Sequence, residues 1–177
     1  MIELRNMLNL DKQELDSLTL LVHGGYATGK THLLGDALCE EAKNGPVFFL
    51  NVKGEDGTMT LRGQGLGSNA ATVETVKDYE AALEILHRHK LQALALDSLK
   101  ALNKLIMGDT MPEKSDYIPI HWTMERLVKS LRACAKYVIC SCPSDRSVNQ
   151  LDGSVWITPD LPGREAMGVA GWFNFVG

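Results

Sequence analysis

Continuous runs of apolar residues recur along the chain and predict the strands of a buried sheet. Runs of this kind, bounded by glycine or polar residues, are typical of strands that are covered on both faces. The first run ends in two glycines, and the third ends in Asp97. The runs are residues 18–25, 47–52, 91–97, 137–142 and 154–158, with a closing stretch at 171–177.

Between the runs, apolar residues recur every three or four positions, which predicts amphipathic helices. The first of these stripes is followed by glycine and proline, a combination that ends helices. The stripes cover residues 31–43, 73–86 and 122–135.

Two segments lack a regular period. Residues 53–70 are rich in glycine and predict a loop or a short hairpin. Residues 108–120 contain two prolines and several charges, which predicts an exposed loop. Because strands and helices otherwise alternate, we expect an α/β fold with a mainly parallel sheet in a three-layer domain, and a single domain over residues 1–177.

A glycine-rich segment follows the first predicted strand and opens the first predicted helix. Glycines let the backbone wrap closely around a phosphate, so that successive N–H groups point at its oxygens, and the helix N-terminus adds positive potential. We expect a nucleotide phosphate cradle in which Lys30 reaches the β and γ phosphates as a catalytic residue and Thr31 binds Mg²⁺. The segment reads Gly24, Gly25, Tyr26, Ala27, Thr28, Gly29, Lys30 and Thr31, which fits G-x-x-x-x-G-K-T.

Asp97 is the second candidate metal residue. It ends a predicted parallel strand, and ligands of such sheets bind at the carboxyl edge, where the cradle also lies. There it can hold Mg²⁺ through water, together with Thr31. An aspartate at this position can also cap the helix that begins at Ser98, and the two roles are compatible.

Hydrolysis needs a group that orients and deprotonates water. Glu55 and, after it, Asp56 are the candidates, because they follow the second predicted strand at the same edge. Solvated charges in a turn are the alternative. Ser141, on the strand of residues 137–142, is either a polar sensor of the γ phosphate or a plain buried serine.

Composition excludes some classes of protein. The net charge of -4 excludes a uniformly basic surface that binds nucleic acid by charge alone, but it does not exclude a local basic groove. No apolar run reaches about 18 residues, so we expect no membrane span. The charged N-terminal stretch has no apolar signal core, which favours a cytoplasmic protein. Its four cysteines are expected to be reduced and mostly buried: Cys39, Cys134, Cys140 and Cys142.

Several segments resemble a known family. "LTLLVHGGYATGKTHLL" and "LALDSLKAL" resemble the ATPase core of the RecA-like P-loop proteins. "DYIPIHWTMERLVKSLR", "YVICS" and "TPDLPGREAMGVAGWFNFVG" resemble segments of small phage-encoded RecA-like proteins, some of which act in single-strand annealing and recombination. The resemblance implies an ATP-binding, ATP-hydrolysing protein that acts on DNA in phage or bacterial recombination, as a homo-oligomeric ring or filament.

The resemblance also implies where partners bind. Single-stranded DNA would contact the loops at residues 105–120 and 159–170, which carry few basic residues, among them Lys114 and Arg164. Arg146 and Arg164 are candidate fingers for the nucleotide of a neighbouring subunit, and solvated surface arginines are the alternative.

The second strand departs from the family pattern. The family often carries an aspartate there with a glutamate soon after; here Asn51 takes the aspartate's place and the glutamate arrives at Glu55. This departure favours the alternative of a nucleotide-binding switch or assembly subunit with little hydrolysis. A small-molecule kinase also suits the size and fold, but no arginine-rich lid is apparent between residues 105 and 135.

Overall fold

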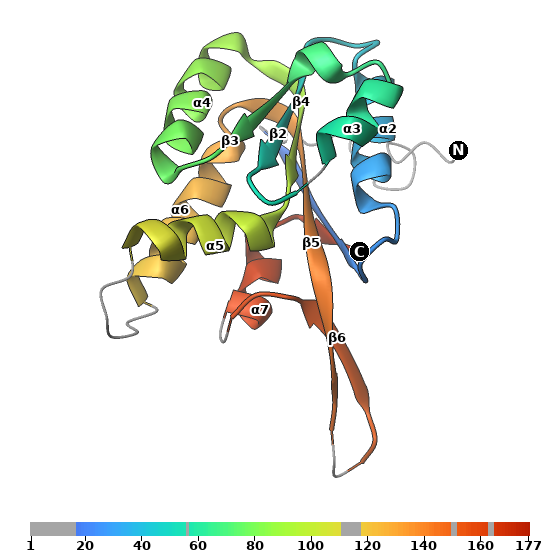
Figure 1. Cartoon of the computed structure of the whole chain (residues 1–177), viewed down its shortest axis with the longest axis vertical. Coiled ribbons are helices and arrows are strands. Elements are labelled where there is room, and N and C mark those ends of the chain that lie inside the picture. The colour runs from blue at the N-terminus through green and yellow to red at the C-terminus, as the bar shows by residue number, and fades with distance from the viewer. Residues whose placement is uncertain (1–16, 56, 111–117, 150–151, 163–164) are drawn as a thin grey trace.

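A computed structural model describes residues 17–55, 57–110, 118–149, 152–162 and 165–177. These residues form an α/β fold in which one mainly parallel sheet has helices on both faces (Figure 1), as the sequence predicts. The strand order is β3-β2-β4-β5-β1-β7, and β6 pairs with β5 outside this path. The strands are β1 (Leu18–Gly24), β2 (Val47–Val52), β3 (Ala70–Val73), β4 (Leu91–Asp97), β5 (Ala135–Val148), β6 (Val155–Pro159) and β7 (Phe175–Val176).

The helices divide between the two faces of the sheet. α2 and α3 cover one face, and α4, α5 and α6 cover the other (Figure 1). None of the described helices is long and apolar enough to cross a membrane. The helices are α2 (Lys30–Glu41), α3 (Gly57–Gly63), α4 (Val76–His89), α5 (Leu99–Thr110), α6 (Ile118–Leu131) and α7 (Glu165–Gly168), with 3-10 turns at Gly67–Asn69 and Val169–Trp172.

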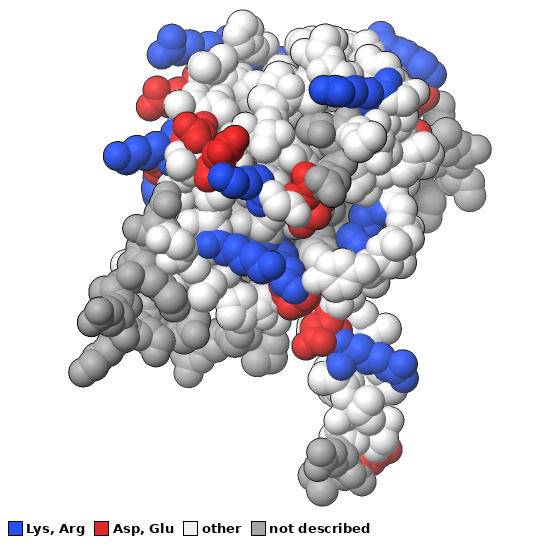
Figure 2. Space-filling view, in the orientation of Figure 1, with Lys and Arg blue, Asp and Glu red and all other residues white. Residues whose placement is uncertain are grey.

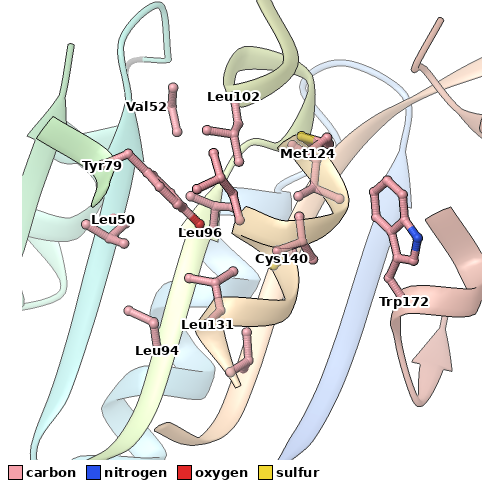
Figure 3. Packing of buried hydrophobic residues seen from close by; sticks show 14 of the residues in the cluster. Leu50, Val52, Tyr79, Leu94, Leu96, Leu102, Met124, Leu131, Cys140 and Trp172 are labelled. Carbon is pink, nitrogen blue, oxygen red and sulfur yellow. The ribbon is translucent and has the colours of Figure 1, made fainter. Parts of the chain in front are cut away.

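β4 contributes apolar side chains to the hydrophobic cores on both faces of the sheet. Successive side chains of a strand point to opposite faces. Ala93 and Ala95 therefore pack in the core beneath α2 and α3, where their small size lets these helices approach closely. Leu94 and Leu96 point the other way, into the larger core beneath α4, α5 and α6, where Tyr79 of α4 is also buried (Figure 3).

Two predicted helical stripes begin or end elsewhere than expected. Val73 lies in β3, because α4 starts later, at a capping box in which Thr75 and Asp78 each accept a bond from the other's backbone N–H. Ala135 belongs to β5. Trp122 is 70% exposed, because the buried face of α6 lies elsewhere: Ile120, Met124, Leu127, Val128 and Leu131.

The prediction of a loop or hairpin over residues 53–70 is wrong. The segment contains α3 and a 3-10 turn, and β3 begins at its end. Leu61 and Leu66 bury their side chains in the core beneath α2, so tertiary packing stabilises a helix that its glycines disfavour. In the segment 108–120, α5 extends to Thr110 and α6 begins at Ile118; residues 111–117 lie outside the described part.

The predicted strand at residues 154–158 exists, but it is not parallel. β6 runs antiparallel to the second half of β5, from the pair Ser144–Pro159 to the pair Val148–Val155. The resulting hairpin projects from the body of the molecule (Figure 1). The first half of β5 stays in the central sheet, between β4 and β1.

The four cysteines are free, as expected, and three of them are buried. We call Cys134, Cys140 and Cys142 the buried thiols. Burial raises the pKa of Cys142 to about 12 and also raises the pKa of the other two.

Candidate phosphate and metal site

The predicted site residues come together at one edge of four adjacent strands. Glu55 follows β2, Asp97 ends β4, Ser141 lies in the part of β5 that pairs with β1, and the glycine-rich loop follows β1. Asn51 pairs with Asp97 in the register of β2 and β4, and Ser141 pairs with Val22 of β1. The residues therefore meet at one edge, although they lie far apart in the sequence.

The loop after β1 leaves the N-terminus of α2 open. Gly29 precedes the helix at φ +82°, Ala27 also has a positive φ of 57°, and no side chain caps the first turn. Thr28 Oγ1 instead donates to Gly25 O, 2.9 Å away, and so holds the loop closed. The first N–H groups of a helix need acceptors, and an anion can supply them here.

Lys30 and Thr31 occupy the first turn of α2. Lys30 Nζ donates to the loop carbonyls of Gly24 and Gly25, at 2.9 and 2.6 Å. Thr31 Oγ1 donates to Asp97 Oδ2 at 2.5 Å. The cradle lysine thus lies folded over its own loop, and the two predicted metal residues are in direct contact.

Asp97 is a buried carboxylate, 3% exposed, held by hydroxyl groups from two other elements. Thr31 donates to one of its oxygens, and Ser141 Oγ donates to the other. The Ser141 hydroxyl therefore orients Asp97. The peptide bond from Asp97 to Ser98 is cis.

Glu55 reaches the same edge through a tight turn. Its backbone N–H donates to Val52 O at 3.1 Å, and Gly54 adopts a φ of +98°, which favours glycine. The turn directs the chain back, and Glu55 Oε1 accepts a hydrogen bond from Ser98 Oγ at 2.6 Å. Glu55 is thereby tied to the residue that follows Asp97.

Tyr26 of the loop forms a cluster with Lys100 and Asp160, two residues that the sequence predictions did not single out. Lys100 Nζ donates to Tyr26 OH at 2.9 Å and to Asp160 Oδ2, and it lies 5.6 Å from the centre of the Tyr26 ring. The hydrogen bond to Asp160 raises the pKa of Lys100 above its usual value. The cluster joins the loop, the first turn of α5 and the end of the hairpin.

Other predicted residues lie away from this edge or outside the described part. Arg146 is exposed on the projecting hairpin, paired with Ile157 of β6. Asp56, Lys114 and Arg164 lie outside the described residues, as do parts of both predicted DNA loops. Figure 2 shows acidic and basic side chains interspersed on the face in view, without a broad basic surface.

The residues at the edge fit a hydrated magnesium ion bound to a phosphate. Within the described residues, no three His, Cys, Asp or Glu side chains form a cluster that could hold a metal ion. Asp97, Thr31 and Asn51 instead offer carboxylate, hydroxyl and amide oxygens, which suit Mg²⁺. The buried Asn51 Oδ1 has no hydrogen-bond partner among the described residues.

No family model matches the chain, and no curated protein matches it.

Proposed function

We propose that this protein is a RecA-like ATPase that binds ATP and Mg²⁺ at residues 24–31 and Asp97 and acts on DNA in recombination. The observation that carries the proposal is the open N-terminus of α2, set against a buried carboxylate. This arrangement suits a nucleoside triphosphate with its cation, because it combines uncapped helix N–H groups, the Lys30 ammonium and the Thr31–Asp97 contact.

The chain's residues divide the work of hydrolysis. When a nucleotide binds, Lys30 Nζ leaves the carbonyls of Gly24 and Gly25 and donates to phosphate oxygens instead. These oxygens are charged, so they form stronger hydrogen bonds with the ammonium group than neutral carbonyls do. Thr31 and Asp97 would hold a magnesium ion, which would supply positive charge against the charge that develops on the phosphates. Ser141 keeps Asp97 oriented through its hydrogen bond.

Glu55 is the proposed base that orients and deprotonates water. The turn at Gly54 returns it to the carboxyl edge, so its late position in the sequence does not remove it from the site. Its contact with Ser98 also supports the second candidate function, a nucleotide-binding switch. A carboxylate that stays bonded to Ser98 has one acceptor oxygen engaged, and turnover would then be slow.

The proposed homo-oligomer is supported by the hairpin of β5 and β6. Val148 pairs with Val155, and Ile157 lies two residues further, so all three share one face of the ribbon. They are 54%, 47% and 62% exposed. A two-stranded ribbon alone is marginally stable in water, so coverage of this face by a second copy is favourable. Ile157→Lys should lower the mass measured by light scattering. DNA as the partner rests on the family resemblance.

Phosphate release and nucleotide binding, measured on the same preparations, test the ATPase proposal. We expect Mg²⁺-dependent turnover that single-stranded DNA accelerates, and loss of both binding and turnover in Lys30→Ala. Glu55→Gln should keep ATP binding and lose turnover by about 10²–10⁴-fold, the usual contribution of a general base.

Glu74→Gln is the matched control, because Glu74 is an exposed carboxylate just after β3 that pairs with Lys53. It should turn over ATP like the unmodified protein. Tight binding with negligible turnover, with or without DNA, would select the switch. A folded protein that binds no ATP would refute both functions.

A further inference from the structure

Asn51 carries a buried oxygen that lacks a partner at the carboxyl edge. The residue is 2% exposed, and no described residue donates to its Oδ1. An acceptor buried without a donor is unfavourable, and native structures seldom keep one without a reason. The sequence predictions treated Asn51 only as a missing aspartate, so this oxygen is a separate observation.

The orientation of the Asn51 amide is fixed by its nitrogen. Nδ2 donates to the backbone oxygen of Glu55 at 3.0 Å and to Thr72 Oγ1 at 3.3 Å. The opposite orientation would set Oδ1 against the Glu55 carbonyl, which places two acceptors face to face. Oδ1 therefore points away from Glu55 O, toward the space beside Asp97.

Gly57, the first residue of α3, locates that space. A Cβ atom on Gly57 would lie 3.1 Å from Asn51 Oδ1, 3.1 Å from Asp97 Oδ2 and 3.0 Å from Thr31 Cγ2. The two oxygens therefore lie close to each other beside Gly57, with Thr31 next to them. A side chain at position 57 would crowd both oxygens, whereas glycine does not.

We propose that Asn51 is a third oxygen contact of the metal site and that glycine at position 57 keeps the Asn51 and Asp97 oxygens uncrowded. Asn51 Oδ1 would accept a hydrogen bond from a water of the cation's hydration shell. Mg²⁺ keeps several of its waters in proteins, and these waters are donors only. An acceptor with no other partner matches such a water. The inference rests on the proposed binding of ATP and Mg²⁺.

Two variants test the inference by different routes. Asn51→Leu removes the oxygen at similar volume, and Gly57→Ala crowds the Asn51 and Asp97 oxygens without removing either. Gly63→Ala is the matched control, since Gly63 ends the same helix and its added Cβ would meet nothing within 4 Å. Thermal unfolding in EDTA checks that all three variants are folded.

The quantity to measure is the gain in nucleotide affinity caused by metal. Titration calorimetry with a non-hydrolysable ATP analogue gives the dissociation constant in EDTA and in Mg²⁺, and the ratio of the two is that gain. We expect Asn51→Leu and Gly57→Ala to reduce it about 10–100-fold, as loss of outer-shell partners does, and Gly63→Ala to leave it unchanged.

The affinity in EDTA separates this inference from the proposed function. If the unmodified protein binds the analogue but either variant keeps the full increase in nucleotide affinity caused by Mg²⁺, the proposed role of Asn51 and Gly57 is overturned and the ATPase proposal stands. If the unmodified protein binds no analogue in EDTA or in Mg²⁺, the proposed function fails, and the inference fails with it.

Discussion

The ion pair between Lys100 and Asp160 should couple the glycine-rich loop to the end of the hairpin. Lys100 comes from α5 and Asp160 follows β6, and both bond near Tyr26 of the loop. Their side chains are 24% and 31% exposed, so water screens the pair only in part. We predict that Lys100→Met and Asp160→Asn each destabilise the fold, and that their effects are not additive.

The size of the coupling follows from this half-buried position. Exposed ion pairs contribute about 0.2–1 kcal/mol, and hydrogen bonds to charged groups about 1.5–3 kcal/mol. A pair between these limits should show a coupling free energy of about 1 kcal/mol. For a chain of 177 residues, a change of about 1 kcal/mol moves the unfolding midpoint by roughly 2–4 °C.

A double-mutant cycle measured by urea unfolding gives the coupling directly. The pair Lys129–Glu125 on α6 is the control, because it is an i,i+4 pair with more exposed side chains and should couple more weakly. Effects of Lys100→Met and Asp160→Asn that add within about 0.3–0.5 kcal/mol would refute the reasoning. Hydrogen exchange of residues 24–29 should also rise in Asp160→Asn, since the loop loses an anchor.

Three further predictions concern buried groups. Tyr79→Phe should raise the free energy of unfolding, measured with urea, by about 1 kcal/mol. The reason is that the Tyr79 hydroxyl is fully buried without a partner among the described residues, so a lower urea midpoint in the variant would contradict the prediction. Under native conditions a thiol reagent should label Cys39, which is partly exposed, and leave the buried thiols unmodified until the protein unfolds, as mass spectrometry can establish. Burial lowers the pKa of His23, so the unfolded chain binds protons more readily and the free energy of unfolding falls as the pH drops below about 6.5. His23→Asn should flatten the profile of unfolding free energy against pH between about pH 5 and 7. An equally steep profile in the variant would count against the burial of His23.

The sequence predicts the parts of the site that depend on strand ends. The loop of residues 24–31 and Asp97 follow or end buried apolar runs, and parallel strands bring such ends to one edge. Ser141 lies near the end of the run 137–142. Contacts that depend on side chains from distant elements are not predictable in this way. Lys100 and Asp160 are 60 residues apart, and no periodicity links them.

Glu55 shows that spacing along the chain does not fix where a side chain lies. Counted along the chain, it comes four residues after Asn51. The turn at Gly54, with its positive φ, brings it back to the carboxyl edge, where it bonds to Ser98. The helix α3 was missed for a related reason, because the two buried leucines that stabilise it stand in a glycine-rich segment with no clear period.

If the proposed function holds, the amide at position 51 also affects how the metal and the nucleotide bind. Asn51 and Asp97 are neighbours in the register of β2 and β4, and both are buried. A carboxylate at both positions would place two negative charges together before any cation arrives, which is unfavourable in a buried site. With an amide at position 51, Asp97 is the one carboxylate of this strand pair, and the Thr31 and Ser141 hydroxyls satisfy it. The edge can then stay assembled without metal, but Asp97 alone would attract Mg²⁺ weakly. Phosphate oxygens must supply the remaining negative charge, so metal and nucleotide should bind this edge together, each strengthening the other.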